Sequence, residues 1–202
     1  NAIRELQGRV EVLGALDYGL EECQPGQYRS VIVCRVDDEA QGFDDFVNKT
    51  AAINSDDSYS GYGALLATVN PFVEKGKFFE KTIICGSHRQ SMKAIANKQA
   101  DVAAIDEVVW NLAFDYEPEV EALRVIGKTQ PMPAPPLITN WSNNSLRHVL
   151  NEAIEEAVSL LDETTKSALQ LYGYKHMDLV DYEPILRQLN EIKDPQKILG
   201  ID

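Results

Sequence analysis

Short apolar, β-branched runs that alternate with amphipathic stretches are the feature that most limits the folds open to this chain. Strands are expected at residues 31–36, 51–54, 81–85, 101–105 and 123–127, and helices at residues 61–69, 87–97 and 107–114. This order is typical of βαβ units, and strands that are apolar along their whole length are typical of sheets covered on both faces. The sequence therefore predicts an α/β fold with mostly parallel sheets flanked by helices.

A proline-rich segment at residues 131–136 interrupts this pattern and is expected to be an extended crossing segment. From residue 145 the pattern becomes helical, with apolar residues at steps of three and four: Leu146, Val149, Leu150, Ile154, Val158 and Leu161. Two further helices are expected at residues 165–172 and 182–192. The end of the chain is thus predicted to be a helical tail.

The charge of the chain argues against a nucleic acid or an anionic membrane as partner. The formal net charge is -13 and the sequence pI is about 4.6, so there is no basic field that would attract polyanions. Any anion that binds must be held by local geometry. The three cysteines are an odd number with no Cys-x-x-Cys spacing, and they define neither a disulfide framework nor a compartment.

Two turns that lead from a strand into a helix are candidates for binding an anion. The first is Asn-Ser-Asp-Asp-Ser-Tyr-Ser-Gly at residues 54–61, and the second is Gly-Ser-His at residues 86–88. The start of a helix offers free N–H groups to an anion, and Ser58, Ser60 and His88 add side-chain donors. Two simpler interpretations stay open: Ser58 only caps its helix, and His88 is an ordinary surface residue.

A family resemblance rests on four segments in register. They are Pro-Gly-Gln-Tyr-Arg-Ser-Val-Ile-Val at 25–33, the turn at 54–61, Gly-Ser-His with Ser91 at 86–91, and Ala-Asp-Val-Ala-Ala-Ile-Asp at 100–106. In this order and spacing the chain resembles the substrate-binding proteins of phosphate, phosphite and phosphonate ABC transporters. The resemblance covers about residues 8–140.

The resemblance implies a two-lobed periplasmic-binding-protein fold of type 2. Residues 1–33 and 128–202 would form the first lobe and residues 34–127 the second, with a small tetrahedral oxyanion held in the cleft between them. The implied partner is an ABC-transporter permease, and the implied location is periplasmic or extracytoplasmic, although no signal peptide is visible in the sequence. The family implies no catalytic residue, cofactor or metal.

Six residues inherit a ligand-binding role from the resemblance. Ser58, Tyr59, Ser60 and His88 would hold the phosphoryl oxygens, Tyr28 would reach the ligand through its hydroxyl, and Asp106 would lie near the ligand substituent or cap the next helix. Of Tyr59, only the backbone N–H is expected to take part. The proline segment lacks an acidic residue that some aminophosphonate binders use, which favours a simple oxyanion.

Two further expectations follow. His88 is expected to become cationic when an anion binds, so affinity would fall as the pH rises through an imidazole pKa near ~6.5. Relatives usually begin with another strand-helix-strand portion, so an unpaired sheet edge near Val10 to Leu20, or the apolar faces of the tail helices, would favour a homo-oligomer.

Other classes of function are less well supported by the residues. Cys85 and His88 lie three positions apart without an orienting third group, and the three histidines lie too far apart in sequence for a metal-ligand motif. The alternatives that stay open are a small-molecule lyase on the same scaffold and a ligand-sensing module without transport.

Overall fold

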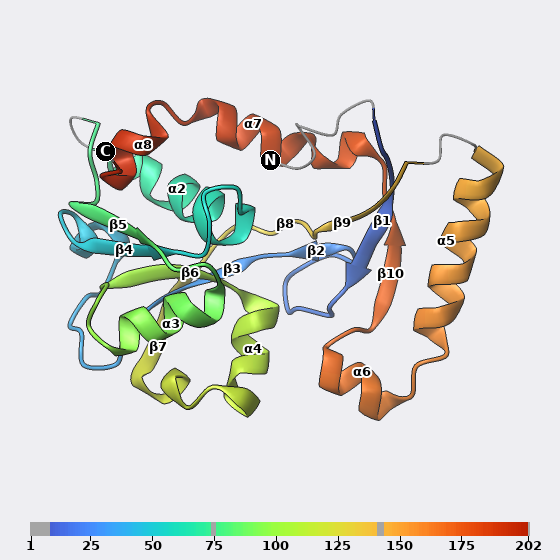
Figure 1. Ribbon diagram of the computed structural model, residues 1–202, viewed down its shortest axis with the longest axis horizontal. Helices are drawn as coiled ribbons and strands as arrows, with labels where there is room; N and C mark the ends of the chain where they lie inside the picture. The colour runs from blue at the N-terminus through green and yellow to red at the C-terminus, as the bar shows by residue number, and fades with distance from the viewer. Residues whose placement is uncertain (1–8, 74–75, 141–143, 202) are drawn as a thin grey trace. The chain divides into compact units, whose positions relative to one another are not determined.

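The computed structural model describes residues 9–73, 76–140 and 144–201, and it divides into two compact units (Figure 1). Unit 1 comprises Asn1–Arg29 and Pro131–Arg187, and unit 2 comprises Ser30–Gln130 and Gln188–Asp202. The lobe boundaries expected from the sequence differ from these at residues 30–33, 128–130 and 188–202. The largest difference is the last fifteen residues, which pack with unit 2.

Unit 2 is built on a sheet with the strand order β5-β4-β6-β3-β7. The strands are β3 (Ser30–Arg35), β4 (Thr50–Ile53), β5 (Lys81–Ile84), β6 (Val102–Asp106) and β7 (Leu123–Lys128). β4 runs parallel to β5 and β6, whereas β3 runs antiparallel to β6 and β7. The helical elements are η1 (Phe43–Phe46), η2 (Tyr59–Gly63), α2 (Ala64–Val69), η3 (Asn70–Phe72), α3 (His88–Ala96), α4 (Glu107–Tyr116), η4 (Pro118–Ala122) and α8 (Pro195–Leu199).

The predicted α/β class is confirmed, and all five predicted strands lie in this sheet. The parallel arrangement holds for β5, β4 and β6, and the antiparallel β3 makes the sheet mixed. The direction of β3 was not readable from the sequence. An inner strand covered on both faces is apolar throughout, whichever way its neighbours run.

The sheet of unit 2 has a hydrophobic core on each face, and the two cores use alternate residues of the same strands. Val31 and Val33 pack in the core beneath α3 and α4, whereas Ile32 and Cys34 pack in the core that includes residues of α2 and α8. Because successive side chains of a strand point to opposite faces, an apolar strand buries both faces at once.

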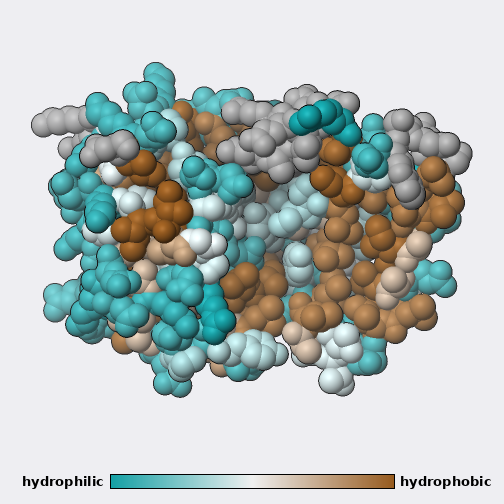
Figure 2. Space-filling view, in the orientation of Figure 1, coloured by the Kyte–Doolittle hydropathy of each residue, from teal (hydrophilic) through white to brown (hydrophobic). Residues whose placement is uncertain are grey.

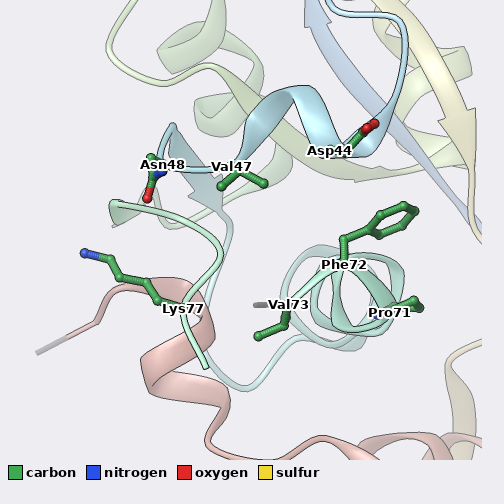
Figure 3. Close-up of a pocket in the computed structure, with 7 residues that line it drawn as sticks. All are labelled: Asp44, Val47, Asn48, Pro71, Phe72, Val73 and Lys77. Carbon is green, nitrogen blue, oxygen red and sulfur yellow. The ribbon is translucent and has the colours of Figure 1, made fainter. Parts of the chain in front are cut away.

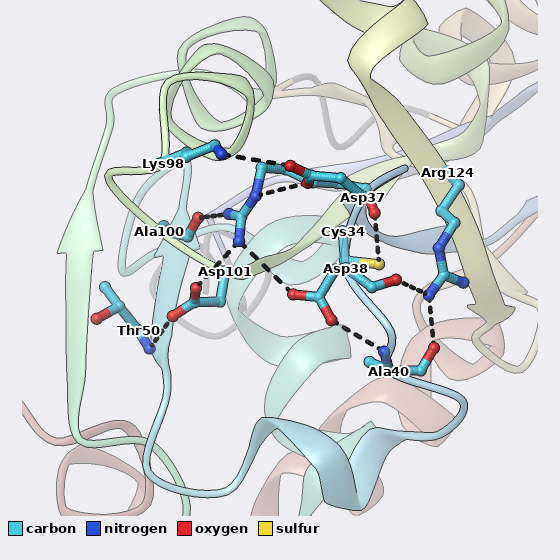
Figure 4. Close-up of polar contacts among 10 residues, drawn as sticks. Cys34, Asp37, Asp38, Ala40, Thr50, Lys98, Ala100, Asp101 and Arg124 are labelled. Atoms are coloured by element: carbon cyan, nitrogen blue, oxygen red, sulfur yellow. Dashed lines mark hydrogen bonds and ion pairs between the residues drawn. The ribbon is translucent and has the colours of Figure 1, made fainter.

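A network of ion pairs holds the edge of this sheet where β3 ends and where β4 and β6 begin (Figure 4). The Arg35 guanidinium donates to the carbonyl of Ala100 at 3.1 Å and to the Asp37 carboxylate at 3.2 Å. It also lies 3.6 Å from a carboxylate oxygen of Asp38 and 3.7 Å from one of Asp101. The Arg35 side chain is only 15% exposed, so its loss would leave the partly buried carboxylates of Asp38 and Asp101 without this cation.

We expect Arg35→Met to lower the free energy of unfolding by about 1–3 kcal/mol, because the acids keep their desolvation cost and lose their partner. Lys98 reaches Asp37 in the same network, but its side chain is 69% exposed. The matched control Lys98→Met should therefore change stability by less than about 0.5 kcal/mol. Urea denaturation of both variants measures the difference, and equal effects would contradict the role given to Arg35.

Unit 1 holds a three-stranded antiparallel sheet in the order β10-β1-β9 and a short ribbon of β2 and β8. The strands are β1 (Glu11–Asp17), β2 (Gln27–Tyr28), β8 (Met132–Pro133), β9 (Pro136–Thr139) and β10 (Gly173–His176). The helices of the tail are α5 (Asn144–Ser159), α6 (Glu163–Leu169), η5 (Leu179–Tyr182) and α7 (Glu183–Glu191), of which α7 spans the unit boundary at residue 187.

Two expectations for unit 1 are corrected by this sheet. The tail is not purely helical, because β10 lies between α6 and η5. Its sequence, Gly-Tyr-Lys-His, lacks the apolar alternation that would have indicated a strand. Nor is the segment from Val10 to Leu20 an unpaired sheet edge, because β1 pairs with β9 on one side and with β10 on the other.

The apolar stripe predicted for α5 is only partly buried. Val158 is 7% exposed, but Leu146 and Val149 are 43% and 57% exposed. Hydrophobic residues are visible on the surface over this part of unit 1 (Figure 2). Among the described residues, no helix combines the length and the apolar character needed to span a bilayer.

Candidate functional site

The candidate site of unit 2 lies at the edge of the sheet opposite the Arg35 network. β4, β5 and β6 end there, each followed by a turn into a helix, and the antiparallel β3 begins there with Ser30. Carboxyl ends of neighbouring parallel strands are a common place for ligand sites, because the turns that follow them converge. Polar residues of both candidate turns are therefore brought to one edge.

The first turn enters the helix through one turn of π-helix, η2, before α2 continues it. The N–H of Gly63 donates to the carbonyl of Ser58 at 3.1 Å, and Ser58 Oγ caps the helix by accepting from the N–H of Gly61 at 3.2 Å. The hydroxyl of Ser30 donates to the carbonyl of Ser60 at 2.8 Å and ties this turn to β3. Single π-helical turns of this kind are often found at functional sites.

Ser58, Ser60 and His88 form one cluster. Ser60 Oγ lies 2.9 Å from Nε2 of His88 and 3.4 Å from Oγ of Ser58. Ser87 caps α3 by accepting from the N–H of Gln90 at 3.2 Å, which places His88 in the first turn of that helix. The structure thus brings together the side chains of two turns that the sequence singled out separately.

The environment of His88 determines its charge before any anion binds. Burial lowers the pKa of the His88 imidazole to about 4, and the backbone carbonyl of Ala104 only partly opposes this shift. No charged side chain is among the causes. Desolvation disfavours the imidazolium form, so His88 is neutral at neutral pH in the protein without ligand, and its protonation on anion binding stays a prediction.

Sequence reasoning missed Asn54 and Gly61, which join the two turns. Asn54 Nδ2 donates to Ser58 Oγ at 3.0 Å and lies 3.5 Å from His88 Nε2. A Cβ atom on Gly61 would lie 1.9 Å from Asn54 Oδ1 and 3.2 Å from Cε1 of His88. Gly61 is therefore required by close packing. The only signal in the sequence was an asparagine directly after a strand and a glycine early in the next helix.

The side chain of Tyr59 turns to a different set of partners. Its hydroxyl donates to Oε1 of Gln188 at 2.5 Å, and burial raises the pKa of this phenol. Tyr59, Gln188 and Lys128 are among the residues that line a pocket of about 240 Å³. The expected role of the Tyr59 backbone N–H in anion binding stays a prediction.

Asp106 is the N-cap of α4. One of its carboxylate oxygens accepts from the N–H of Val108 at 2.9 Å and from that of Val109 at 3.4 Å. Burial raises the pKa of Asp106 to about 6, although these two N–H donors oppose the shift. Asp106 is also paired with Ser30 in the register of β6 and β3, so it lies at the same edge of the sheet as the cluster.

Tyr28 belongs to unit 1, where it is 5% exposed and pairs with Met132 between β2 and β8. Its proposed contact with a ligand stays a prediction.

The described residues give little support to metal or thiol chemistry. They contain no group of three or more His, Cys, Asp or Glu side chains that would hold a metal ion. Burial raises the pKa of the Cys85 thiol, which disfavours the nucleophilic thiolate. A larger pocket of about 680 Å³ in unit 2 (Figure 3) has mainly apolar walls, with Asp44 and Lys77 as its charged residues. It offers no cluster of neutral donors like that of Ser58, Ser60 and His88.

Comparisons with known proteins show the family of the chain. The family model for the phosphonate periplasmic substrate-binding proteins of ABC transporters matches residues 6–184. A comparison with curated protein sequences gave no match. Among solved structures, PhnD1 of Prochlorococcus marinus in complex with methylphosphonate is similar with a TM-score of 0.76 and 17% identity, over 94% of this chain and 74% of that one.

Two more solved structures share the fold. The binding protein component of an ABC phosphonate transporter from Pseudomonas aeruginosa has a TM-score of 0.70 and 22% identity, over 91% of this chain and 62% of that one. A Xanthomonas citri protein bound to ATP has a TM-score of 0.70 and 15% identity, over 96% of this chain and 75% of that one. The family match covers most of the chain, and the protein therefore belongs to the phosphonate periplasmic substrate-binding proteins of ABC transporters.

Proposed function

We propose that this protein binds a small tetrahedral oxyanion of the phosphate, phosphite or phosphonate class at Ser58, Ser60 and His88. It then delivers the anion, outside the cytoplasm, to an ABC-transporter permease. The single observation that carries the proposal is the cluster itself. The hydroxyl of Ser60 lies within 3.4 Å of both the Ser58 hydroxyl and the His88 imidazole, which comes from a turn about thirty residues further along the chain, and the cluster lies beside the start of a helix.

The donors in this cluster are neutral, which suits a protein with a formal net charge of -13. Long-range attraction cannot recruit an anion to such a chain, so affinity must come from short hydrogen bonds and from the free N–H groups at the start of η2. A binding site of this kind holds and releases its ligand without a covalent step. The solved relative with methylphosphonate bound supports the same ligand class.

We expect Ser58→Ala and Ser60→Ala each to weaken the binding of methylphosphonate or phosphite by about 1–3 kcal/mol, the cost of a lost hydrogen bond to an anion. Ser58→Ala should also destabilise the fold by about 1 kcal/mol, because it removes the helix cap. Titration calorimetry measures the affinities, and thermal unfolding checks that both variants are folded.

The matched control is Ser55→Ala. Ser55 lies in the same loop, but its hydroxyl donates to the Asp57 carboxylate at 2.6 Å and is not part of the cluster. The control should bind as the parent does. Unchanged affinity in folded Ser58→Ala and Ser60→Ala variants would remove these hydroxyls from the site.

A further inference from the structure

The hydrogen bonds around Ser58 fix the direction of its hydroxyl. Ser58 Oγ accepts from Asn54 Nδ2 at 3.0 Å and from the N–H of Gly61 at 3.2 Å. A serine oxygen has two acceptor lone pairs, and both are then in use. The remaining Ser58 O–H must donate, either weakly to Ser60 Oγ at 3.4 Å or to a bound anion.

The packing of Asn54 determines which end of its side-chain amide faces His88. Oδ1 of Asn54 lies against Gly61, without a hydrogen-bond partner in the described part of the chain. Rotating the amide would put its NH₂ group there, and a buried donor would be left without an acceptor. With the orientation observed, Nδ2 keeps two hydrogens for two neighbours, Ser58 Oγ at 3.0 Å and His88 Nε2 at 3.5 Å.

With this orientation of the Asn54 amide, we assign His88 Nε2 as the acceptor of the cluster. It faces the Asn54 amide hydrogen and the hydroxyl of Ser60, which assigns the proton of the neutral imidazole to Nδ1. The backbone carbonyl of Ala104 interacts with this imidazole, although buried Nδ1 makes no hydrogen bond of normal geometry in the described part of the chain. The ionisable residues on the elements around it are Asp56 and Asp57 in the first turn, Tyr59 and Tyr62 on η2, Cys85 in the second turn, Arg89 and Lys93 on α3, and Asp106 on β6. Arg89 is paired with Glu117, and none of these residues shifts the titration of His88.

From this arrangement we propose that the site selects the singly protonated form of its oxyanion, whose P–OH group donates to His88 Nε2. The proton stays on the ligand. Ser60, whose hydroxyl is released from Nε2, then donates to an unprotonated oxygen together with Ser58 and the N–H groups at the start of η2. This inference rests on the proposed function, because it concerns the same site and the same class of ligand.

A fully deprotonated oxyanion fits the same atoms poorly. Its oxygens carry no hydrogen, so one of them would face the Nε2 lone pair, and the imidazole would have to take up a proton. Burial disfavours that uptake, which is consistent with a His88 pKa of about 4. The site thus distinguishes two charge states of one ligand, because His88 Nε2 is a hydrogen-bond acceptor among groups that donate.

The test is titration calorimetry of the full chain with methylphosphonate and with phosphite between about pH 5.5 and 9. We expect constant affinity below the second pKa of each anion and a loss of about tenfold per pH unit above it, because only the monoanion binds. The midpoint should move with the anion, since methylphosphonate and phosphite ionise at different pH. Sulfate, a dianion without a proton at these pH values, should bind at least about a hundredfold more weakly.

His88→Gln provides the matched variant, because a glutamine amide can present an NH₂ donor where Nε2 presents an acceptor. It should reduce the preference for methylphosphonate over sulfate by about tenfold or more, while Ser55→Ala should keep the preference of the parent. Affinity that is constant or rises through the second pKa, or sulfate binding as tight as that of methylphosphonate, would overturn the inference and leave the proposed function standing. Absence of binding to every oxyanion at every pH would overturn both.

Discussion

Gly61→Ala is expected to destabilise the protein by about 2–3 kcal/mol and to weaken oxyanion binding at least tenfold. The added methyl group would lie 1.9 Å from Asn54 Oδ1 and 2.7 Å from Asn54 Cγ, distances at which atoms cannot coexist. Asn54 must then move and give up its hydrogen bond to Ser58 Oγ. Forcing an extra carbon into a packed site typically costs about 1–3 kcal/mol, and the broken hydrogen bond adds to this.

The origin of this loss can be tested with a double variant. Asn54→Ala removes the atoms that the new methyl group would meet, which leaves only Cε1 of His88 at 3.2 Å. The combination Gly61→Ala with Asn54→Ala should therefore be more stable than the sum of the two single changes, by about 1 kcal/mol or more. Chemical denaturation of all four proteins measures this coupling. Additive effects would mean that the contact with Asn54 is not the source of the loss.

The strands and helices of unit 2 were readable from the sequence because their patterns are complete. Each strand from β3 to β7 is a short apolar run, and Ser87 and Asp106 stand at the helix starts where caps are expected. Unit 1 was harder to read. β1 carries Gly14, which is opposite His176 in β10. A Cβ atom on Gly14 would clash with the carbonyl oxygen of Lys175, and such a glycine weakens the strand pattern.

The candidate site could be predicted from the sequence in its residue types but not in its chemistry. Ser58, Ser60 and His88 are polar residues at the starts of helices, which a sequence shows. The low pKa of His88 depends on burial by residues far away in the chain, and the role of Asn54 depends on a direct contact with Gly61. Both follow from packing, which a single sequence does not display.

Asp106→Asn is expected to stabilise the protein at pH 7 by about 1–3 kcal/mol. Burial raises the folded-state pKa of Asp106 from its ordinary value of 3.8 to about 6. The folded protein thus holds this proton more tightly than the unfolded chain does. The free energy of unfolding therefore falls as the pH rises from about 4 to about 6, by roughly 1.4 kcal/mol for each tenfold difference in proton affinity between the two states.

Asparagine carries no charge to desolvate, and its amide oxygen can still cap α4 by accepting from the N–H of Val108. The gain of Asp106→Asn should be full at pH 7 and should be small near pH 4, where the wild-type carboxyl is protonated in the folded state and nearly half protonated in the unfolded chain. Asp162 offers the matched control, since it caps α6 in the same way, with a pKa lowered chiefly by the N–H of Thr165. Asp162→Asn should bring no gain at pH 7.

Urea denaturation of the three proteins at several pH values from 4 to 8 measures both effects. An Asp106→Asn variant that is less stable than the parent at pH 7, or whose gain does not depend on pH, would contradict the raised pKa. A buried carboxylate such as Asp106, which lowers stability at pH 7, is typical of a ligand-binding site. Groups that bind a ligand are not selected for stability alone. If Asp106 does contact the ligand substituent, the stabilised variant should also bind methylphosphonate and phosphite with a changed ratio of affinities, whereas a residue that only caps α4 would leave that ratio as it is.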